Sequence, residues 1–385
     1  MNFLFPYMAR WKAINWTRFQ RILSAIAEQG HTVHVIQMPK SHLRETNFQE
    51  IDVRLSPNIH LHDLGLNGFH WRHQYPFHKL IKKGLYSLAC VATVRRMIRE
   101  FHIDVLLVYN LSQYPILRAT SCLKIFDYAD DYIDMLKFEL GFLQNPLLLS
   151  LGRKLLQGMA KRADLTFAVS HVLADSLDGI SEVKVIANGV DLKNFTPDPD
   201  AIPHHFTKPV IGFLGSFEYF IDFDVILHAA QQLGQYTFLL VGAGRNYDDV
   251  ERKIKKMGLA NVVLTGGVPF HQVPSYIKRM DVCLNIFKDM PVSHGASPMK
   301  LFEYIALRKP VISTRLKEVH IIDRDFIYYA DTGIELVARI EEILRNREKS
   351  AARAEVAYEY VRKNYTWDHI VRQFLAAINE KMSLA

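Results

Sequence analysis

Few cysteines and the absence of any long apolar run restrict what this chain can be. Only three cysteines occur in 385 residues, far apart at Cys90, Cys122 and Cys283. They share no metal-ligand spacing and each lies in or beside an apolar run, which indicates reduced core residues rather than a disulfide framework. No apolar stretch approaches the roughly 18 residues needed to span a bilayer. We therefore expect a cytoplasmic protein without a spanning helix.

A secretory signal, a sequence repeat and a zinc motif are also missing. The first six residues have no charged region followed by an apolar core, so they do not resemble a leader. We expect most histidines in loops, and they match no zinc spacing; examples are His60, His62, His70, His73 and His78. The sequence assigns no metal ligand and no cofactor.

The composition that is present is typical of a globular protein. Hydrophobic residues make up 49% of the chain and charged residues 23%, with a formal net charge of +7. A chain of this length exceeds what one hydrophobic core usually supports, so two domains are expected. The positive charge favours acidic surfaces or ligands without naming one.

Strands alternate with helices along the chain, which predicts an α/β protein with parallel sheets. In the first half we expect helices near 16–29 and 151–161, and strands at 2–5, 32–36, 105–108, 124–126, 164–170 and 183–186. The second half repeats the pattern, with strands at 210–214, 236–241, 262–264, 281–286 and 311–313. A last helix near 367–381 has an apolar stripe. Turn residues at 188–191 and a linker at 196–200 separate the two halves.

The most informative segment runs from Ser297 to Thr314. Ser297 is a good helix N-cap and Pro298 suits the first helical turn, so a helix of about ten residues is expected to begin here. Its first N–H groups and dipole, with the mobile cation of Lys300, suit a diphosphate. Glu303 lies one turn further on, where a carboxylate accepts hydrogen bonds from sugar hydroxyls. The pattern predicts a nucleotide-sugar site.

These residues resemble the donor-binding motif of nucleotide-sugar glycosyltransferases with the two-domain GT-B fold. The similarity is to family 4-like members, of the retaining lipopolysaccharide and capsule type. Such proteins often carry a Glu-x7-Glu signature; here Glu303 matches the second glutamate and Gly295 stands at the first. In members with a Ser-Pro-(Met/Leu)-Lys-x-x-Glu-Tyr version, the lysine is implied to approach the diphosphate. The resemblance implies a donor site made of Gly215, Ser216, Val268, Ser297, Met299, Lys300 and Glu303.

Two other stretches are similar to the same family. Gly30-His31 before the second strand resembles the opening of these transferases, and the Asn-Gly-Val-Asp-x-x-x-Phe stretch that ends at Phe195 resembles their interdomain junction. The resemblance implies two Rossmann-like domains that face each other across a cleft. We expect an acceptor-side domain at 1–200, a donor domain at 201–365 and a helix at 366–385 that crosses back to the first domain.

One departure concerns the diphosphate grip. The family commonly has an arginine after the glycine of the second domain's first strand and a lysine about six residues beyond it. Ser216 and Ile221 stand at these positions, so both cations are missing. Lys300 and its helix N-terminus are the nearest replacements, and Arg10 or Lys12 are further candidates.

Carboxylates gather after the expected strand at 124–126, within Asp127–Tyr132. Such crowding requires a nearby cation or hydrogen-bond donors. Asp130 and Asp131 are candidates for binding sugar hydroxyls, or for a base if the enzyme inverts configuration. Alternatively, one of them caps a helix. His294, just before the donor loop, either binds the sugar or phosphate or is a solvated loop residue.

Aromatic and basic residues are interleaved between Leu66 and Arg99. This pattern suits an anionic bilayer surface, and a solvated basic helix packed on the domain is the alternative. Nucleic acid is disfavoured because no recognition motif accompanies the charge. We expect the protein in the cytoplasm, peripheral on the inner face of the cell membrane if this surface binds lipid.

The sequence therefore predicts a glycosyltransferase. It would move a sugar from a nucleotide-diphosphate sugar to a lipid-linked, polysaccharide or other glycan acceptor, with retention of configuration implied by the resemblance. Two alternatives remain open: a sugar-nucleotide epimerase of the same fold, and a catalytically degenerate partner subunit. No metal cofactor is expected. The nucleotide base, the sugar and the acceptor are not specified by the sequence.

Overall fold

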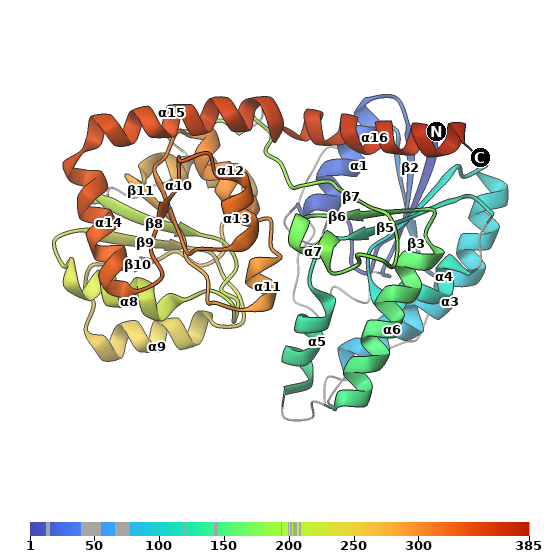
Figure 1. The fold of residues 1–385 in the computed structure, drawn as a ribbon, viewed down its shortest axis with the longest axis horizontal. Coiled ribbons are helices and arrows are strands. Elements are labelled where there is room, and N and C mark those ends of the chain that lie inside the picture. Colours follow the sequence, from blue (N-terminus) through green and yellow to red (C-terminus); the bar gives the residue numbers. More distant parts are fainter. Residues whose placement is uncertain are drawn as a thin grey trace. The chain divides into compact units, whose positions relative to one another are not determined.

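The computed structural model contains two sheets, each built entirely of parallel strand pairs (Figure 1). It describes residues 1–12, 16–39, 55–65, 78–118, 121–141, 145–193, 195–198, 200, 202, 206–207 and 209–384. The chain divides into a first unit, Met1–Ala187 with Val371–Ala385, and a second unit, Asn188–Ile370. Each unit holds one of the sheets.

The seven-stranded sheet of the first unit has the order β3-β2-β1-β4-β5-β6-β7. Its strands are β1 (Asn2–Pro6), β2 (Thr32–Gln37), β3 (Ile59–Asp63), β4 (Val105–Val108), β5 (Leu123–Tyr128), β6 (Leu165–Ala168) and β7 (Val183–Val185). The strand order changes direction between β1 and β4, because β1 pairs with β2 on one side and β4 on the other. In open parallel sheets, ligands bind beyond the carboxyl ends of strands at such a point.

The helices of the first unit follow the apolar periodicity of the chain. They are α1 (Arg18–Glu28), α3 (His78–Glu100), the 3₁₀ turn η1 (Leu111–Gln113), α4 (Tyr114–Leu117), α5 (Tyr132–Leu140), α6 (Pro146–Arg162) and α7 (His171–Asp175). A capping box starts α1, where the Thr17 N–H donates to Gln20 Oε1 at 3.0 Å. Phe19, Ile22 and Ile26 then recur at helical spacing and are buried.

The six-stranded sheet of the second unit has the order β10-β9-β8-β11-β12-β13. Its strands are β8 (Val210–Leu214), β9 (Thr237–Val241), β10 (Val262–Leu264), β11 (Val282–Asn285), β12 (Val311–Ser313) and β13 (Tyr328–Tyr329). All residues of β8, β11 and β12 are buried, as expected for strands covered on both faces. The order changes direction between β8 and β11.

The helices of the second unit include the one predicted to bind donor. They are α8 (Phe223–Gln232), α9 (Tyr247–Met257), η3 (Phe270–Gln272), α10 (Val273–Arg279), α11 (Pro291–His294), α12 (Met299–Ala306), α13 (Lys317–Ile322), α14 (Gly333–Arg345) and α15 (Arg347–Asn364). The last helix, α16 (Trp367–Ser383), begins in this unit, and its residues from Val371 belong to the first. There Phe374 packs on Phe167 of β6, with ring centroids 4.6 Å apart.

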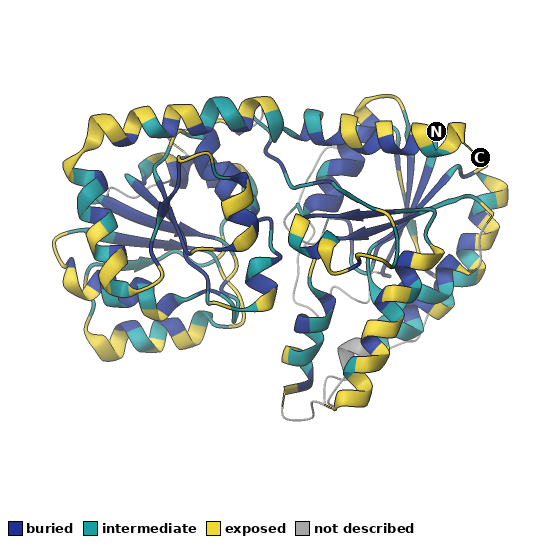
Figure 2. Cartoon of the chain, viewed as in Figure 1, coloured by how far each residue is buried: buried dark blue, intermediate teal, exposed yellow. Residues whose placement is uncertain are grey.

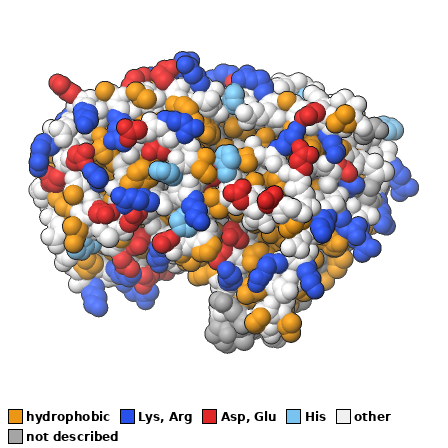
Figure 3. Space-filling model, in the orientation of Figure 1, with side chains coloured by type: hydrophobic (Ala, Val, Ile, Leu, Met, Phe, Trp, Pro, Cys, Tyr) orange, Lys and Arg blue, Asp and Glu red, His pale blue; other side chains and the backbone are white. Residues whose placement is uncertain are grey.

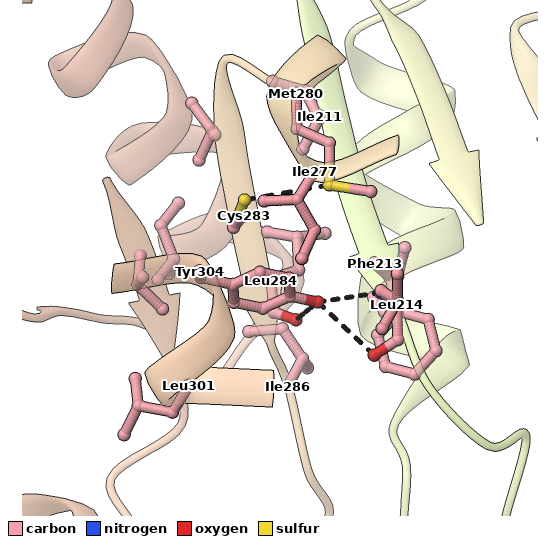
Figure 4. Close-up of a cluster of buried hydrophobic side chains, with 14 of the residues drawn as sticks. Ile211, Phe213, Leu214, Ile277, Met280, Cys283, Leu284, Ile286, Leu301 and Tyr304 are labelled. Atoms are coloured by element: carbon pink, nitrogen blue, oxygen red, sulfur yellow. Dashed lines mark hydrogen bonds between the residues drawn. The ribbon is translucent and has the colours of Figure 1, made fainter. Parts of the chain in front are cut away.

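Helix α12 is fixed to the sheet by a tyrosine (Figure 4). The Tyr304 hydroxyl accepts the Leu214 N–H at 2.7 Å and lies 3.3 Å from the Leu284 carbonyl oxygen. Leu301, one turn earlier on the same face, is fully buried. The helix is thereby held against β8 and β11, the two strands between which the order changes direction.

Within each unit the central strands are buried and most charged side chains lie outside (Figure 2). All eleven predicted strands are confirmed, and four of them have the predicted bounds. Two strands were not predicted, β3 and β13. In the part of the chain that the structure describes, no helix is both long and apolar enough to cross a bilayer.

The assignment of the histidines to loops is wrong for three of them, since His78 begins helix α3. His60 and His62 lie on β3, and His34 lies opposite them on β2. The His34 and His62 rings are linked by a 3.0 Å contact between Nδ1 and Nε2. Burial, with the neighbouring imidazoles, lowers the pKa of His34 to about 4, so the His34 ring is neutral at pH 7. His70 and His73 lie outside the described residues.

Candidate functional site

Two glycine loops meet at the carboxyl edge of the second unit's sheet. The first follows β8 and the second follows β9, and the Phe217 N–H donates to the Ala243 carbonyl at 3.0 Å. Gly242 has a φ of +139°, and a Cβ there would lie 1.9 Å from the Gly215 carbonyl oxygen. Only glycine permits this backbone-on-backbone contact. The glycines therefore allow the two loops to pack closely, and the two loops together form the surface on which a ligand would bind.

Lys300 extends from α12 to the surface formed by the two glycine loops. Its Nζ lies 4.1 Å from the ring centroid of Phe213 and 5.3 Å from that of Phe287. A Cβ on Gly215 would lie 2.8 Å from Lys300 Nζ, so the glycine also makes room for the ammonium. Desolvation lowers the pKa of Lys300 to about 7, and the negative charge of Glu303 partly opposes this shift. A cation held over aromatic rings and destabilised by burial gains most from an anionic ligand.

The start of α12 differs from the prediction by one or two residues. The helix runs over eight residues with Pro298 as N-cap, so the prediction that Ser297 is the N-cap is wrong. Ser297 instead contacts Asn188, whose side-chain amide donates to the Ser297 carbonyl at 2.7 Å and whose N–H donates to Ser297 Oγ at 3.4 Å. Among the described residues, no side-chain oxygen caps α12. Its first-turn N–H groups thus lack a side-chain cap, next to Met299 and Lys300.

The other predicted donor residues lie on three neighbouring loops and the same helix. Glu303 lies one turn after Lys300 and is buried, and Ser216, after Gly215, is exposed. Val268 follows β10, on a loop whose Gly266 carbonyl accepts the Gly242 N–H at 2.9 Å. Sequence-distant residues are thus gathered at one sheet edge.

His294 is not a solvated loop residue, because it lies in a helix and its ring makes two polar contacts. It ends the short helix α11, and its Nδ1 accepts the Lys317 N–H at 3.3 Å. This leaves the proton on Nε2, which lies 2.6 Å from Asp289 Oδ1. The ring is therefore held in one tautomer, three residues before Ser297.

The acidic cluster of the first unit is only partly available for a ligand. Strand β5 extends through Tyr128, so Asp127 lies in the strand and not after it. Arg18 Nε and Nη2 donate to the two Asp127 oxygens at 2.9 and 3.2 Å, and both side chains are buried. Asp131 caps α5 by accepting the N–H groups of Ile133 and Asp134. The capping alternative is thus confirmed for Asp131.

Asp130 is the carboxylate that faces accessible space. It is exposed, and it lines a cavity at the carboxyl edge of the first unit's sheet. Restricted hydration and the charge of Asp127 raise the pKa of Asp130 to about 6, although Arg18 and Lys83 act in the opposite direction. A carboxyl group poised near neutral pH suits hydroxyl binding and proton transfer.

Arg10 does not replace the two cations that are missing from the diphosphate site. Its guanidinium is buried and donates to the Met38 carbonyl at 2.7 Å and to Asp63 at 3.0 Å, so it is a structural residue of the first unit. The sequence did not indicate Arg245, which follows the glycines after β9 and whose Nε lies 3.5 Å from Glu218 Oε2.

Ile221 is buried. Among the described residues, no group of three or more His, Cys, Asp or Glu is arranged to hold a metal ion.

Comparison with family models finds a match over most of the chain. Residues 17–194 match the model described as Glycosyltransferase Family 4. Residues 224–376 match a second model, described as Glycosyl transferase-like. The first match includes strands β2 to β7, and the second includes strands β9 to β13.

Among curated proteins, the chain is 28% identical over 231 residues to a Bacillus subtilis (strain 168) protein provisionally named as a teichuronic acid biosynthesis glycosyltransferase. That match covers 56% of each chain, so it spans little more than half the relative's length. A 2-deoxystreptamine glucosyltransferase of Streptomyces kanamyceticus is 28% identical over 156 residues, covering 37% of this chain and 40% of that one.

Solved structures share the whole fold. A sucrose-phosphate synthase from Thermosynechococcus elongatus aligns with a TM-score of 0.80 at 14% identity, over 100% of both chains. Anabaena HepE in complex with UDP-glucose aligns with a TM-score of 0.71 at 15% identity, over 99% of this chain and 100% of that one. At these identities the likeness concerns the fold.

Proposed function

The chain belongs to the glycosyltransferases of GT-B fold, and we propose that it transfers a sugar from a nucleoside-diphosphate sugar to an acceptor. The observation that carries the proposal is Lys300, whose ammonium lies against Gly215 at the carboxyl edge of the second unit's sheet. This is where parallel sheets bind ligands, and where the uncapped first turn of α12 adds N–H donors. That neighbours of the same fold were solved with UDP or UDP-glucose supports a nucleotide-sugar donor.

The proposed chemistry is electrostatic. The diphosphate that departs with the nucleotide gains negative charge in the transition state, and a preorganised cation stabilises it most where water is excluded. Lys300 and the α12 N–H groups supply this charge without a metal ion. The carboxylate of Glu303, one helical turn on, accepts hydrogen bonds from the ribose hydroxyls.

The sugar and acceptor would be handled by three further residues. Asp130, with its raised pKa, is suited to bind a sugar or acceptor hydroxyl, and Asp131 is the second proposed reacting group of the first unit. His294 of the second unit is proposed to bind the sugar or the phosphate. Resemblance to the retaining group supports retention of configuration, which requires no side-chain nucleophile. The acceptor is proposed to be lipid-linked, a polysaccharide or another glycan.

We also propose that the protein is cytoplasmic and attaches peripherally to the inner face of the cell membrane. Residues 66–77 of the interleaved segment lie outside the described residues. The remainder forms α3, whose exposed side chains include the apolar Leu88 and the basic Arg95, Arg96 and Arg99. Such a surface suits anionic headgroups.

The donor proposal is tested by thermal-shift measurements with a panel of nucleoside diphosphates and their sugars. A ligand that binds only the folded state raises the melting temperature once its concentration exceeds its dissociation constant. We expect at least one nucleoside diphosphate and its sugar to stabilise the protein, and the Lys300→Ala variant to lose this response. No response to any member of the panel would contradict donor binding.

A further inference from the structure

A large cavity in the first unit has no assigned role. It has a volume of about 680 Å³, within the roughly 300–1,000 Å³ typical of small-molecule sites. It starts at the carboxyl edge of the sheet, beside Asp130, where Asn110, Ser112 and Lys83 supply its polar groups. From there it extends between α3, α5 and α6.

Away from the sheet, the cavity wall is almost entirely apolar. It is lined there by Met135, Leu136, Leu140, Leu148, Leu151 and Leu155, with Glu139 of α5 as the charged exception. Gly152 of α6 lies close to α5, since a Cβ there would come within 3.0 Å of Leu136 Cδ2. A polar glycan would leave its hydroxyl groups unpaired against such walls, at a cost that an apolar chain avoids.

The apolar wall continues onto the surface. Leu151 is 54% exposed, Leu148 44% and Ile81 45%, although all three line the cavity. Leu147 at the start of α6 is 78% exposed and Phe138 of α5 is 41% exposed. Figure 3 shows hydrophobic side chains next to Lys and Arg side chains over α5 and α6. A contiguous exposed apolar surface of this kind marks a binding site.

We propose that this cavity binds the hydrocarbon chain of a lipid-linked acceptor, with the phosphate of that lipid near Lys83 and the reacting hydroxyl near Asp130. The inference rests on the proposed function, and it selects one of the three acceptor classes. The basic groups that would hold the phosphate are Lys83 at the polar end and Arg153 and Lys154, which are exposed on α6. The cavity is also lined by the carboxylates Asp130 and Glu139, so the phosphate must approach from the side of the basic residues. The leucines of the rim then face the bilayer from which the lipid enters.

The test uses n-alkyl phosphates of 6, 8, 10 and 12 carbons as probes (chain lengths chosen to step by two methylenes), titrated by calorimetry below their micelle concentrations. Each added pair of methylenes should tighten binding roughly tenfold until the cavity is filled. Inorganic phosphate should not bind measurably, and decanol should bind more weakly than decyl phosphate. Lys83→Ala should reduce the affinity for decyl phosphate and leave that for decanol unchanged.

Two cavity variants and a matched control complete the design. Leu151→Asp and Leu148→Asp place a charge at partly exposed wall positions and should weaken decyl phosphate binding at least tenfold, with unchanged melting temperatures. Ile334→Asp changes a 77% exposed apolar residue on α14 of the second unit and should bind like the unchanged protein. The proposal would be overturned if the affinity for alkyl phosphates did not depend on chain length. It would also be overturned if Ile334→Asp weakened decyl phosphate binding as much as the two cavity variants do.

Titration with UDP in the same preparations separates this inference from the proposed function. If UDP binds and alkyl phosphates do not, the acceptor proposal fails alone. If alkyl phosphates bind and no nucleoside diphosphate does, the donor proposal fails. Self-association that requires Leu151, together with no alkyl phosphate binding, would instead assign the cavity to a contact between two copies of the chain.

Discussion

At the scale of single residues, donor binding should depend on the protonation of Lys300. Its pKa is lowered to about 7 in the folded protein, so the ammonium loses its proton as the pH rises through that value. A diphosphate binds the charged form, so affinity for UDP-glucose, which has no phosphate group titrating in this range, should fall between pH 6 and 8.5. Calorimetry at four pH values measures this.

Lys300→Arg is the matched control, because a guanidinium keeps its charge throughout this range. Its affinity for UDP-glucose should vary little with pH, even if a changed fit makes it weaker overall. A falling affinity in both proteins would show that another group titrates, and Arg245 would become the next cation to examine.

Glu303 gives a second prediction at this scale. Glu303→Gln should weaken binding of the nucleoside diphosphate by about 1.5–3 kcal/mol, the cost of losing a charge-assisted hydrogen bond to the ribose. The isosteric amide should keep the melting temperature within a few degrees. Unchanged affinity by calorimetry would remove Glu303 from the site.

The residues of the donor site could be predicted because their chemistry is local. Lys300 and Glu303 lie within one turn of one helix, so their spacing is visible in the sequence. The Arg18–Asp127 ion pair joins residues 109 positions apart, and nothing in either neighbourhood indicates it. The sequence therefore indicated that the crowded carboxylates need a nearby cation, but it could not show that Arg18 is the cation that pairs with Asp127.

At the scale of elements, the two glycine loops should be intolerant of a side chain. Gly242→Ala would place Cβ 1.9 Å from the Gly215 carbonyl oxygen, in a backbone conformation that alanine rarely adopts. The loops must separate, so we expect a lower melting temperature and loss of nucleoside diphosphate binding. Gly234→Ala is the control, since a Cβ there meets nothing within 4 Å.

Equal melting temperatures and UDP affinities for the two alanine variants would show that the loop contact does not shape the donor site. A loss of stability in Gly242→Ala without any loss of affinity would restrict the contact to a structural role.

The strands that the sequence failed to predict both lie at sheet edges. β3 and β13 are the last strands of their sheets. In β3 only Ile59 is buried, because two histidines and an aspartate fill three of the other positions and Leu61 is half-buried. β13 has only two residues. Central strands such as β8 are buried on both faces and read as continuous apolar runs, whereas edge strands give a weak hydrophobic signal.

At the scale of the whole molecule, we expect salt-sensitive binding to anionic vesicles. Each basic side chain near the surface contributes roughly 1 kcal/mol, screened within a Debye length. Sedimentation with vesicles should rise with the anionic lipid content and fall with added salt. Changing Lys82, Lys83 and Arg96 to Ser should reduce it.

The same triple change on α9, at Arg252, Lys255 and Lys256, is the control and should leave vesicle binding intact. Equal binding to neutral vesicles, or none to either kind, would return α3 to the role of a solvated helix. If both triple variants lost vesicle binding to the same extent, the net charge of the protein alone would account for the binding.

The central claim is that a nucleoside-diphosphate sugar binds where α12 meets the β8 and β9 loops. A crystal structure of the protein with UDP-glucose tests it most directly. We predict a diphosphate oxygen within about 3 Å of Lys300 Nζ, the hydrogen-bond range for charged partners. The ribose hydroxyls should contact Glu303. A nucleotide bound elsewhere, or at this edge with its diphosphate turned away from Lys300, would contradict the claim.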